Sequence, residues 1–389
     1  MNRPDPMTEQ QKKISVVTNI PNPYRIPLFN ELNRQMEERG MKLKVFFGSA
    51  GYARRKFKVN LDDCRFEYEI LDSEKMHFGN DEKTYFSYKG ITKAIKYEKP
   101  DAIIVSGFSI VTIRFWFRSF FHRTNYVIWS GSIEKKGRHD SWARVLLRKM
   151  LVKRASAFIS YGSKATAYLQ QLGAEKNKIF TAINTVDTEF YFTRTKSVKN
   201  SLKKTGGEKY LTYVGYLTPR KNVMQLLKVI QKLAEARQDF VLDIIGDGED
   251  RVKLETFVNE NGLSQRVRFH GFVQKEQLPD YFGRSSCFLF QTGFDIWGLV
   301  LNEAMAAGLP CVSSLNAGAT FDLVRENETG FKMDFDKVDE VVNTINRMLD
   351  QETEADRIGE NASRFIRENA SLELSAGGFI KAIEATVKG

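Results

Sequence analysis

The sequence predicts an α/β protein of two domains, each a doubly wound parallel sheet with helices on both faces. Short β-branched or aromatic runs alternate with helical patterns along the whole chain, which is typical of parallel sheets. A length of 389 residues with 42% hydrophobic content exceeds what one ordinary core accommodates. A polar, lysine-rich segment at 191–210 also separates two halves of similar pattern.

The expected strands follow one another through both halves of the chain. In the first half they are ISVVTN (14–19), LKVFFG (43–48), AIIVSG (102–107), NYVIWSG (125–131), AFISYG (157–162) and IFTAIN (179–184). In the second half they are YLTYVG (210–215), FVLDIIGDG (240–248), VRFHGF (267–272), CFLFQTG (287–293) and PCVSS (310–314). Apolar residues within 223–234 recur at helical spacing and predict an amphipathic helix between two of these strands.

The domain boundary is expected near residue 200. Segment 191–210 carries Gly206-Gly207 and reads as a solvated linker. We therefore expect an N-terminal domain at 1–198 and a C-terminal domain at 199–371. Ligands of such folds bind beyond the carboxyl ends of the strands and between domains, so a cleft between the two sheets is the expected site.

Composition narrows the classes of partner. The formal charge of +11 favours anionic partners such as nucleotides, phosphorylated lipids or a membrane face. The charge is spread along the chain without a zinc-finger pattern or an aromatic ribonucleoprotein motif, so we do not expect nucleic acid to be the partner. Cys64, Cys287 and Cys311 form neither a disulfide framework nor a zinc pattern, which indicates a reducing compartment.

Membrane insertion is not expected. No apolar run approaches the roughly 18–20 residues that a spanning helix needs. The start, MNRPDPMTEQQKK, lacks the apolar core of a signal peptide. The sequence therefore predicts a cytoplasmic protein.

The segment GFDIWGLVLNEAMAAGLPCVSS (293–314) carries the most chemical information. A helix is expected to begin near Gly298, with Asp295 just before it and Glu303 about one turn inside. The unpaired amides at 298–301 and the helix dipole favour an anion, and Gly298 would allow a phosphate to approach the backbone. A carboxylate beside a phosphate is repelled unless it accepts hydrogen bonds from hydroxyl groups, so the segment suits a ligand with both a phosphate and sugar hydroxyls.

The same segment resembles a known family. The spacing D-x7-E within DIWGLVLNEAMAAGLP resembles the E-x7-E signature of the family-4 retaining glycosyltransferases, which have the two-domain GT-B fold, with Asp in place of the usual first Glu. Further blocks are similar to that family in order and spacing: SYGSKATAYLQQLG (160–173), INTVDTEFY (183–191), VGYLTPRKN (214–222), IIGDGEDRVKLE (244–255), VRFHGFVQKEQLPDYF (267–282) and GATFDLVRENETGF (318–331).

The resemblance implies a nucleotide-diphosphate-sugar donor site in the second domain. Glu303 would hold the ribose hydroxyls and Asp295 the hydroxyls of the donor sugar. The backbone amides of Gly298, Leu299 and Val300 would meet the diphosphate or the sugar.

Two cations and a short strand-end segment complete that donor site. Lys221, with Arg220 beside it, would neutralise the departing diphosphate after the Gly215 turn, where many relatives have an Arg and this chain has Tyr216. The segment that contains Phe272 and Val273 matches the one whose backbone meets the nucleobase. The expected donor site thus also includes Gly215, Arg220, Lys221, Phe272 and Val273.

The first domain is expected to bind the acceptor, and the terminal helix at 372–389 is expected to pack back on it after a break at Gly377-Gly378. Arg25, in the proline-rich loop NIPNPYRIPLF, is a candidate for contact with a donor phosphate or an anionic acceptor. Relatives frequently place a His in the segment that reads VIWSGSIEKKG here, so Ser130 and Ser132 are expected to line the cleft instead.

The resemblance also implies a mechanism. Retention in this family is described as a front-face substitution in which the leaving diphosphate helps to deprotonate the acceptor hydroxyl. The helix N-terminus and the two cations would supply the charge stabilisation that a metal provides elsewhere, so we expect no metal and no cofactor.

Two segments bear on membrane contact. Residues 110–123 mix large aromatic side chains with arginines, and residues 144–154 place five cations along an apolar helical pattern. Interfacial helices have this composition, and so do packed helices with solvated edges. Peripheral contact with an anionic membrane is therefore one of two open interpretations.

The predicted function is transfer of a sugar, with a uridine nucleotide as the expected carrier, to a glycan or lipid-linked glycan in polysaccharide or glycoconjugate biosynthesis. A non-catalytic GT-B nucleotide-binding subunit and a GT-B sugar-nucleotide epimerase are the alternatives, and nothing resembles the pyridoxal phosphate site of a phosphorylase. The donor sugar, the nucleobase, the acceptor and the linkage stay open at this point.

Overall fold

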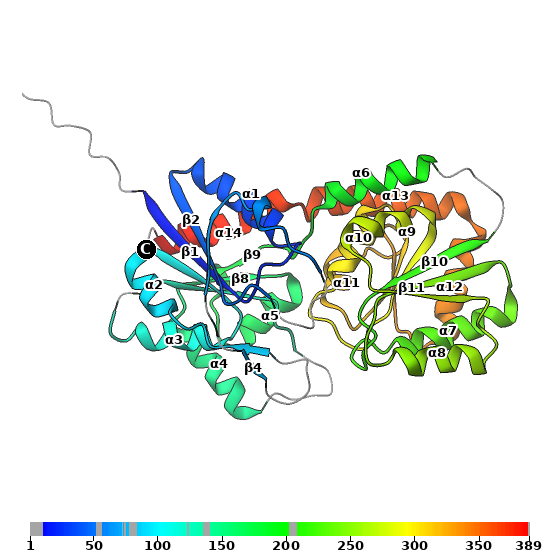
Figure 1. Ribbon diagram of the computed structural model, residues 1–389, viewed down its shortest axis with the longest axis horizontal. Helices are drawn as coiled ribbons and strands as arrows, with labels where there is room; N and C mark the ends of the chain where they lie inside the picture. Colours follow the sequence, from blue (N-terminus) through cyan, green and yellow to red (C-terminus); the bar gives the residue numbers. More distant parts are fainter. Residues whose placement is uncertain are drawn as a thin grey trace, which may run out of the picture.

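The computed structural model describes residues 11–51, 57–71, 73, 75–77, 84–122, 124–134, 141–201 and 208–387. They form two α/β domains that lie side by side (Figure 1). Each domain contains a parallel sheet with helices on both faces, so the predicted fold class is confirmed.

The first sheet has the strand order β3-β2-β1-β6-β7-β8-β9, and every pair in it is parallel. The chain runs outward from β1 to one edge and then returns to β6 on the other side, so the strand order reverses between β1 and β6. The strands are β1 (Lys12–Thr18), β2 (Met41–Phe47), β3 (Glu67–Ile70), β6 (Ala102–Ser106), β7 (Tyr126–Ser130), β8 (Ala157–Ser160) and β9 (Ile179–Thr181), with a separate hairpin of β4 (Lys75–His77) and β5 (Thr84–Phe86).

Two apolar cores hold helices on the two faces of this sheet. One core contains side chains of α1 and α14, and the other contains side chains of α2, α3, α4 and α5. The helical segments of this domain are α1 (Ile26–Glu37), η1 (Leu61–Asp63), α2 (Ile91–Glu98), α3 (Ile110–Arg118), α4 (Trp142–Arg154), α5 (Ser163–Gln171), η2 (Lys176–Lys178) and α14 (Leu372–Val387).

The second sheet has the order β12-β11-β10-β13-β14-β15, which again reverses beside its first strand. Its strands are β10 (Lys209–Val214), β11 (Phe240–Ile245), β12 (Val267–Gly271), β13 (Ser285–Phe290), β14 (Cys311–Ser314) and β15 (Phe331–Met333). The helical segments of this half are α6 (Thr188–Ser201), α7 (Val223–Ala236), α8 (Arg251–Glu260), η3 (Lys275–Gln277), α9 (Leu278–Arg284), α10 (Leu299–Ala306), α11 (Gly318–Leu323), α12 (Val338–Asp350) and α13 (Glu352–Asn369). The amphipathic helix expected at 223–234 is α7, and its apolar stripe is buried.

The segment interpreted as a solvated linker, 191–210, begins instead as helix. Residues 188–201 form α6, which packs against α9, α10 and α13 of the second domain. Tyr191 and Thr195 are buried on that side, Lys196 is exposed, and the Lys199 ammonium donates to the carbonyl of Gly308 at 3.1 Å. A helix with a narrow buried stripe has few apolar residues, which is why its composition resembled a linker.

The C-terminal helix is continuous where a break was expected. α14 runs through Gly377 and Gly378 and packs against α1, β8 and β9 of the first domain. A Cβ on Gly378 would lie 2.4 Å from the carbonyl oxygen of Thr181, whereas one on Gly377 would meet nothing within 4 Å. Gly378 therefore allows the helix to approach β9 closely.

This close approach gives a testable prediction for a matched pair of glycines in one helix. Gly378→Ala should destabilise the protein by about 1–3 kcal/mol, because the new methyl group forces α14 away from β9. Gly377→Ala should instead stabilise it by up to about 1 kcal/mol, because alanine is the better helix former. Urea unfolding of both variants measures the difference, and equal effects would contradict the packing described.

The two domains meet through direct contacts. The backbone amide of Ser163, at the start of α5, donates to both carboxylate oxygens of Asp322 on α11, at 3.0 and 3.1 Å. Trp297 packs so closely on Gly162 that a Cβ there would lie 2.5 Å from its ring. These contacts place the strand-end loops of the two sheets opposite each other.

Candidate active site

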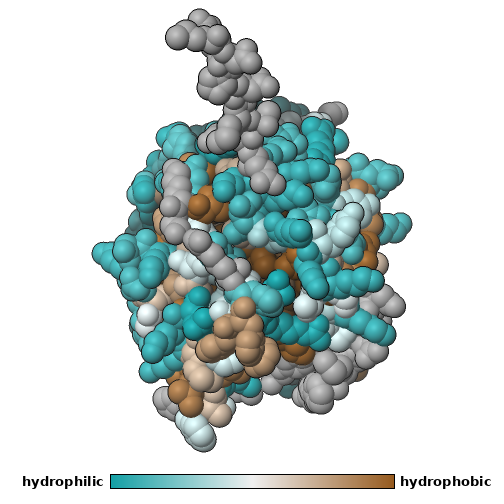
Figure 2. Space-filling model, turned by 90° about the vertical axis from the view of Figure 1, so that its left-hand side faces the viewer, coloured by the Kyte–Doolittle hydropathy of each residue, from teal (hydrophilic) through white to brown (hydrophobic). Residues whose placement is uncertain are grey.

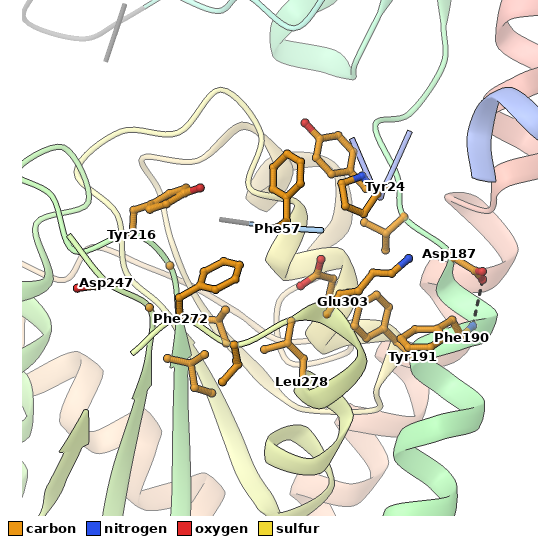
Figure 3. A pocket seen from close by; sticks show the side chains of 18 of the residues that line it. Tyr24, Phe57, Asp187, Phe190, Tyr191, Tyr216, Asp247, Phe272, Leu278 and Glu303 are labelled. Carbon is orange, nitrogen blue, oxygen red and sulfur yellow. Dashed lines mark hydrogen bonds between the residues drawn. The ribbon is translucent and has the colours of Figure 1, made fainter. Parts of the chain in front are cut away.

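A pocket of about 250 Å³ lies between the two domains at the carboxyl ends of their strands. The first domain contributes the loop after β1, with Tyr24, and Phe57; the second contributes the loops after β10, β11 and β12, with Phe272. Figure 3 shows Tyr24 and Phe57 near Glu303, with Phe272 and Leu278 also lining the pocket. The cleft expected from the fold class is therefore present.

Glu303 is the acidic group of this pocket with the most strongly altered titration. It lies on α10, and burial raises its pKa from 4.5 to about 7. A hydrogen bond from the Tyr191 hydroxyl and the nearby Lys275 ammonium both act in the opposite direction, but burial dominates. A group that titrates near neutral pH in a cleft is a candidate for a functional role.

Asp295 and Lys221 form an ion pair beside helix α10. The ammonium of Lys221 donates to the Asp295 carboxylate at 2.5 Å, and the two side chains are only 9% and 18% exposed. Arg220 lies 3.9 Å from the other carboxylate oxygen and donates to the carbonyl of Phe294 at 2.7 Å. The three residues that the sequence assigned to catalysis are thus brought together.

Helix α10 begins where the sequence predicted. Gly298 is its N-cap residue, with φ of 103°, and a Cβ there would lie 2.3 Å from the ring of Phe290. The glycine is therefore required by its left-handed backbone and by packing against Phe290, in addition to any closeness to a ligand. Leu299 and Val300 are partly buried at the first turn. No hydrogen bond within the described part of the chain engages the amides of 298–300.

The turns after β10 and β11 fit closely together. Gly246 has φ of 142°, and a Cβ on it would lie 1.8 Å from the carbonyl oxygen of Gly215. Both glycines line the pocket, as do Phe272 and Val273, which follow β12. Any side chain on Gly246 would therefore collide with the neighbouring turn.

The candidate residues of the first domain lie apart from this pocket. Arg25 is buried, donates to the Tyr161 hydroxyl at 2.9 Å and stacks 4.2 Å from the centre of the Trp129 ring. Ser130 is buried at the end of β7 and accepts a hydrogen bond from the amide of Ser132. None of these three candidates lines the pocket that holds Glu303.

Several lining residues went unrecognised in the sequence. Tyr191 lay in the presumed linker, and Lys275 follows the segment that contains Phe272 and Val273. Tyr24 and Phe57 reach the pocket from the first domain, and only the fold brings them there. Only Lys275 could have been recognised from the sequence, because a cation two residues beyond a strand-end segment indicates a possible contact with an anionic ligand.

The part of the chain that the structure describes holds no group of three or more His, Cys, Asp or Glu side chains placed to bind a metal ion. An Asp-x-Asp pattern follows β15, at Asp334 and Asp336, and neither residue lines the pocket. In the same described residues, no helix is both long and apolar enough to span a bilayer.

The comparisons with known proteins agree with this geometry. Residues 195–365 match the family model described as Glycosyl transferases group 1. The matched residues run from α6 to α13 and so cover most of the second domain. The 2-deoxystreptamine glucosyltransferase of Streptomyces kanamyceticus is 27% identical over 190 residues, which are 48% of this chain and 49% of that protein. N-acetyl-alpha-D-glucosaminyl L-malate synthase of Bacillus anthracis is 26% identical over 199 residues, 50% of each protein.

A solved structure extends the likeness to both domains. The crystal structure of Anabaena HepE in complex with UDP superposes with a TM-score of 0.74 at 16% identity, covering 96% of this chain and 100% of that one. The GT-B fold and the resemblance to a family-4-like glycosyltransferase are thereby confirmed. The matches to the two curated relatives span about half of their length.

Burial of Glu303 predicts a pH-dependent stability. Because its folded pKa of about 7 lies above the unfolded value of 4.5, its contribution to stability is present below the unfolded pKa and is lost as the pH rises through the folded one. Between about pH 5 and about pH 8, Glu303→Gln should gain about 2–3 kcal/mol in unfolding free energy relative to the wild type. Urea unfolding at several pH values measures this gain.

Tyr191→Phe is the matched control for that measurement. It removes a hydrogen bond that lowers the pKa of Glu303, so the midpoint of the pH dependence should move to higher pH. If the free energies of unfolding of the wild type and of Glu303→Gln changed in parallel with pH, the assignment of a buried, titrating carboxyl group to Glu303 would be contradicted.

Proposed function

We propose that this protein is a retaining glycosyltransferase that moves a sugar from a UDP-sugar to a hydroxyl group of a glycan or lipid-linked glycan. The observation that carries the proposal is Glu303, a buried carboxyl group in a pocket at the strand ends, one helical turn from the amides that begin α10. The UDP complex of HepE and the transferase names of the relatives support it. The protein acts in polysaccharide or glycoconjugate biosynthesis, in the cytoplasm and in peripheral contact with the inner face of a membrane.

The nucleoside occupies the pocket between the domains. The backbone at Phe272 and Val273 meets the nucleobase, and Tyr216 and Phe57 add apolar surface around it. Glu303 accepts hydrogen bonds from the two vicinal hydroxyls of the ribose. An ionised carboxylate is the natural acceptor for such a diol, and its pKa near 7 makes that ionisation dependent on binding and on pH.

The diphosphate binds at the start of α10 and beside Lys221. The amides of Gly298, Leu299 and Val300 point along the helix axis toward an anion. The Lys221 ammonium donates a hydrogen bond to the Asp295 carboxylate. The diphosphate replaces Asp295 as the anionic partner of Lys221 and Arg220. The released Asp295 carboxylate then accepts hydrogen bonds from the donor sugar.

The transfer step needs no further protein base. The bond between the anomeric carbon and the departing UDP oxygen breaks, and the acceptor oxygen attacks from the same face. The proton of the acceptor hydroxyl passes to the leaving diphosphate oxygen, so UDP leaves carrying it. Lys221 and Arg220 stabilise the negative charge that develops on that oxygen, which replaces the role of a metal ion, so the reaction is metal-independent and uses no cofactor.

UDP affinity should depend on pH through Glu303. Because the ionised carboxylate binds the ribose hydroxyls, affinity should rise as the pH passes through about 7 and then level off. Glu303→Gln should bind UDP about tenfold more weakly and lose this rise. Calorimetric titration across the range measures both effects, and the variant corrects for the titration of UDP itself. A pH-dependent affinity that survives in Glu303→Gln would contradict the assignment.

Catalysis is tested by UDP release from a panel of UDP- and GDP-sugars with glycan and lipid-linked acceptors. Lys221→Gln should lower the rate by about 10²–10³-fold, because it removes a charge that stabilises the leaving group. Lys228→Gln, which removes an exposed cation of α7 in the same domain, should leave the rate unchanged. Asp295→Asn should weaken donor-sugar discrimination.

The product distinguishes the alternatives. An α-linked product from an α-linked donor, formed at the same rate in EDTA, is expected. UDP binding without turnover for every donor and acceptor would indicate a non-catalytic subunit. Conversion of the donor sugar to an epimer without an acceptor would indicate an epimerase. Inversion at the anomeric carbon, or full loss of activity in EDTA, would overturn the mechanism.

A further inference from the structure

Helices α3 and α4 present large apolar side chains to solvent. Phe117 is 60% exposed, Phe121 is 69% exposed and Trp142 is 79% exposed. Figure 2 shows apolar groups gathered among hydrophilic ones on this end of the molecule. Contiguous exposed apolar groups mark interaction sites more often than isolated ones do. We call these residues the α3–α4 surface: Phe117, Phe120, Phe121, Trp142, Leu146 and Met150.

The spacing of these residues places them in stripes. On α4, Trp142, Leu146 and Met150 recur every four residues and therefore lie along one side of the helix. Phe117 and Phe121 are also four residues apart, and their ring centres are 5.3 Å from each other. The apolar groups thus line one side of α4 and the end of α3.

The fold does not use these side chains for its own core. The same helices bury other residues against the sheet, including Val111 and Phe115 on α3 and Leu151 and Val152 on α4. The exposed stripes lie away from that core, so each helix is apolar on two sides. A surface helix needs only one apolar side to pack, and the second side is available to a partner.

Hydrogen bonds and a cation–π contact join the ends of the two helices. The Arg154 guanidinium, at the end of α4, donates to the hydroxyl and the carbonyl of Ser119 at 2.9 and 2.7 Å. It also stacks 4.1 Å from the centre of the Phe120 ring. These contacts orient the aromatic side chains at the end of α3 relative to the stripe on α4.

The charge of this surface has a single sign. Helix α3 carries two arginines and α4 carries five lysines and arginines, and neither helix contains Asp or Glu. Lys149 and Lys153 are exposed on α4. A protein partner would need a matching acidic surface, whereas a bilayer rich in anionic lipid offers negative charge and an apolar interior together.

We propose that the α3–α4 surface docks the first domain on an anionic lipid bilayer. The aromatic side chains enter the interface between headgroups and acyl chains, and the lysines and arginines lie at the headgroups. This inference deepens the peripheral membrane contact of the proposed function and rests on it, because it names the surface that makes the contact. It also places the first domain, which contributes Tyr24 and Phe57 to the pocket, next to the lipid that would carry an acceptor.

Flotation of the full chain with vesicles tests the surface. The wild type should float with vesicles of phosphatidylcholine and phosphatidylglycerol, less with phosphatidylcholine alone, and less at high salt. Phe117→Ser/Trp142→Ser should lower the bound fraction about tenfold or more on anionic vesicles. Lys149→Gln/Lys153→Gln should weaken both the preference for phosphatidylglycerol and the salt dependence, because it removes two exposed cations while the arginines of α3 and α4 remain.

Matched controls lie on the second domain. Val252→Ser removes an apolar side chain that is 75% exposed on α8, and Lys228→Gln/Lys253→Gln removes two exposed cations. Both should float like the wild type. Equal losses in these controls, or a wild type that stays unbound with every vesicle, would overturn the inference.

Two further measurements distinguish lipid docking from a dimer interface and from a fault in the donor site. Sedimentation without lipid detects a second copy: self-association that Phe117→Ser/Trp142→Ser abolishes would assign the surface to a dimer and overturn the inference. UDP binding on the same preparations reports the donor site alone. A protein that binds UDP and ignores vesicles refutes only the docking surface, whereas one that floats and binds no UDP supports the surface and refutes the proposed donor site.

Discussion

One helix terminus of the first domain binds directly to a side chain of the second. The amide at the start of α5 in the first domain has no partner within its own helix, and Asp322 of the second domain supplies one with both carboxylate oxygens. Burial raises the pKa of Asp322, and its hydrogen bonds to Ser163 oppose that shift. Trp297 packs against Gly162 beside this contact. Together the two contacts determine how far apart the two sets of strand-end loops lie. The pocket depends on that separation, because neither domain encloses it alone.

Under the proposed function, the charges in the pocket and beside it suit a ligand that is both anionic and rich in hydroxyl groups. Glu303 lines the pocket, whereas Lys221 and Asp295 lie outside its lining. Lys221 and Asp295 neutralise each other while they are buried, which avoids the large cost of an isolated buried ion. Among the residues that the structure describes, no cation forms such an ion pair with Glu303, and burial drives it toward the protonated form. A ligand that brings a negative group to Lys221 and hydroxyls to the two carboxylates would satisfy all three residues at once. The arrangement therefore explains why two acids flank a helix start that favours anions.

The sequence predicted the central strands and the position of α10 well, because buried parallel strands are continuous apolar runs. It missed β3, a strand at the sheet edge in which charged and uncharged residues alternate (EYEI). Strand β15, which is only three residues long, was missed as well. It also missed α6, whose small buried stripe is hidden among polar residues. The roles proposed for Asp295, Lys221 and Glu303 rest on local motifs. Tyr191, Tyr24 and Phe57 come from distant segments without a shared motif, and only tertiary packing brings them together.

The path of α14 has a consequence for how the chain reaches its final structure. The chain leaves the first domain before α6 and returns to it after α13, and the two crossings touch where the Thr185 hydroxyl donates to the carbonyl of Ala370. The second domain is thus an insertion within the first. During synthesis, residues 12–182 emerge long before the helix that covers α1, β8 and β9. The apolar face of the first domain that α14 covers therefore stays uncovered until the whole inserted domain has been synthesised.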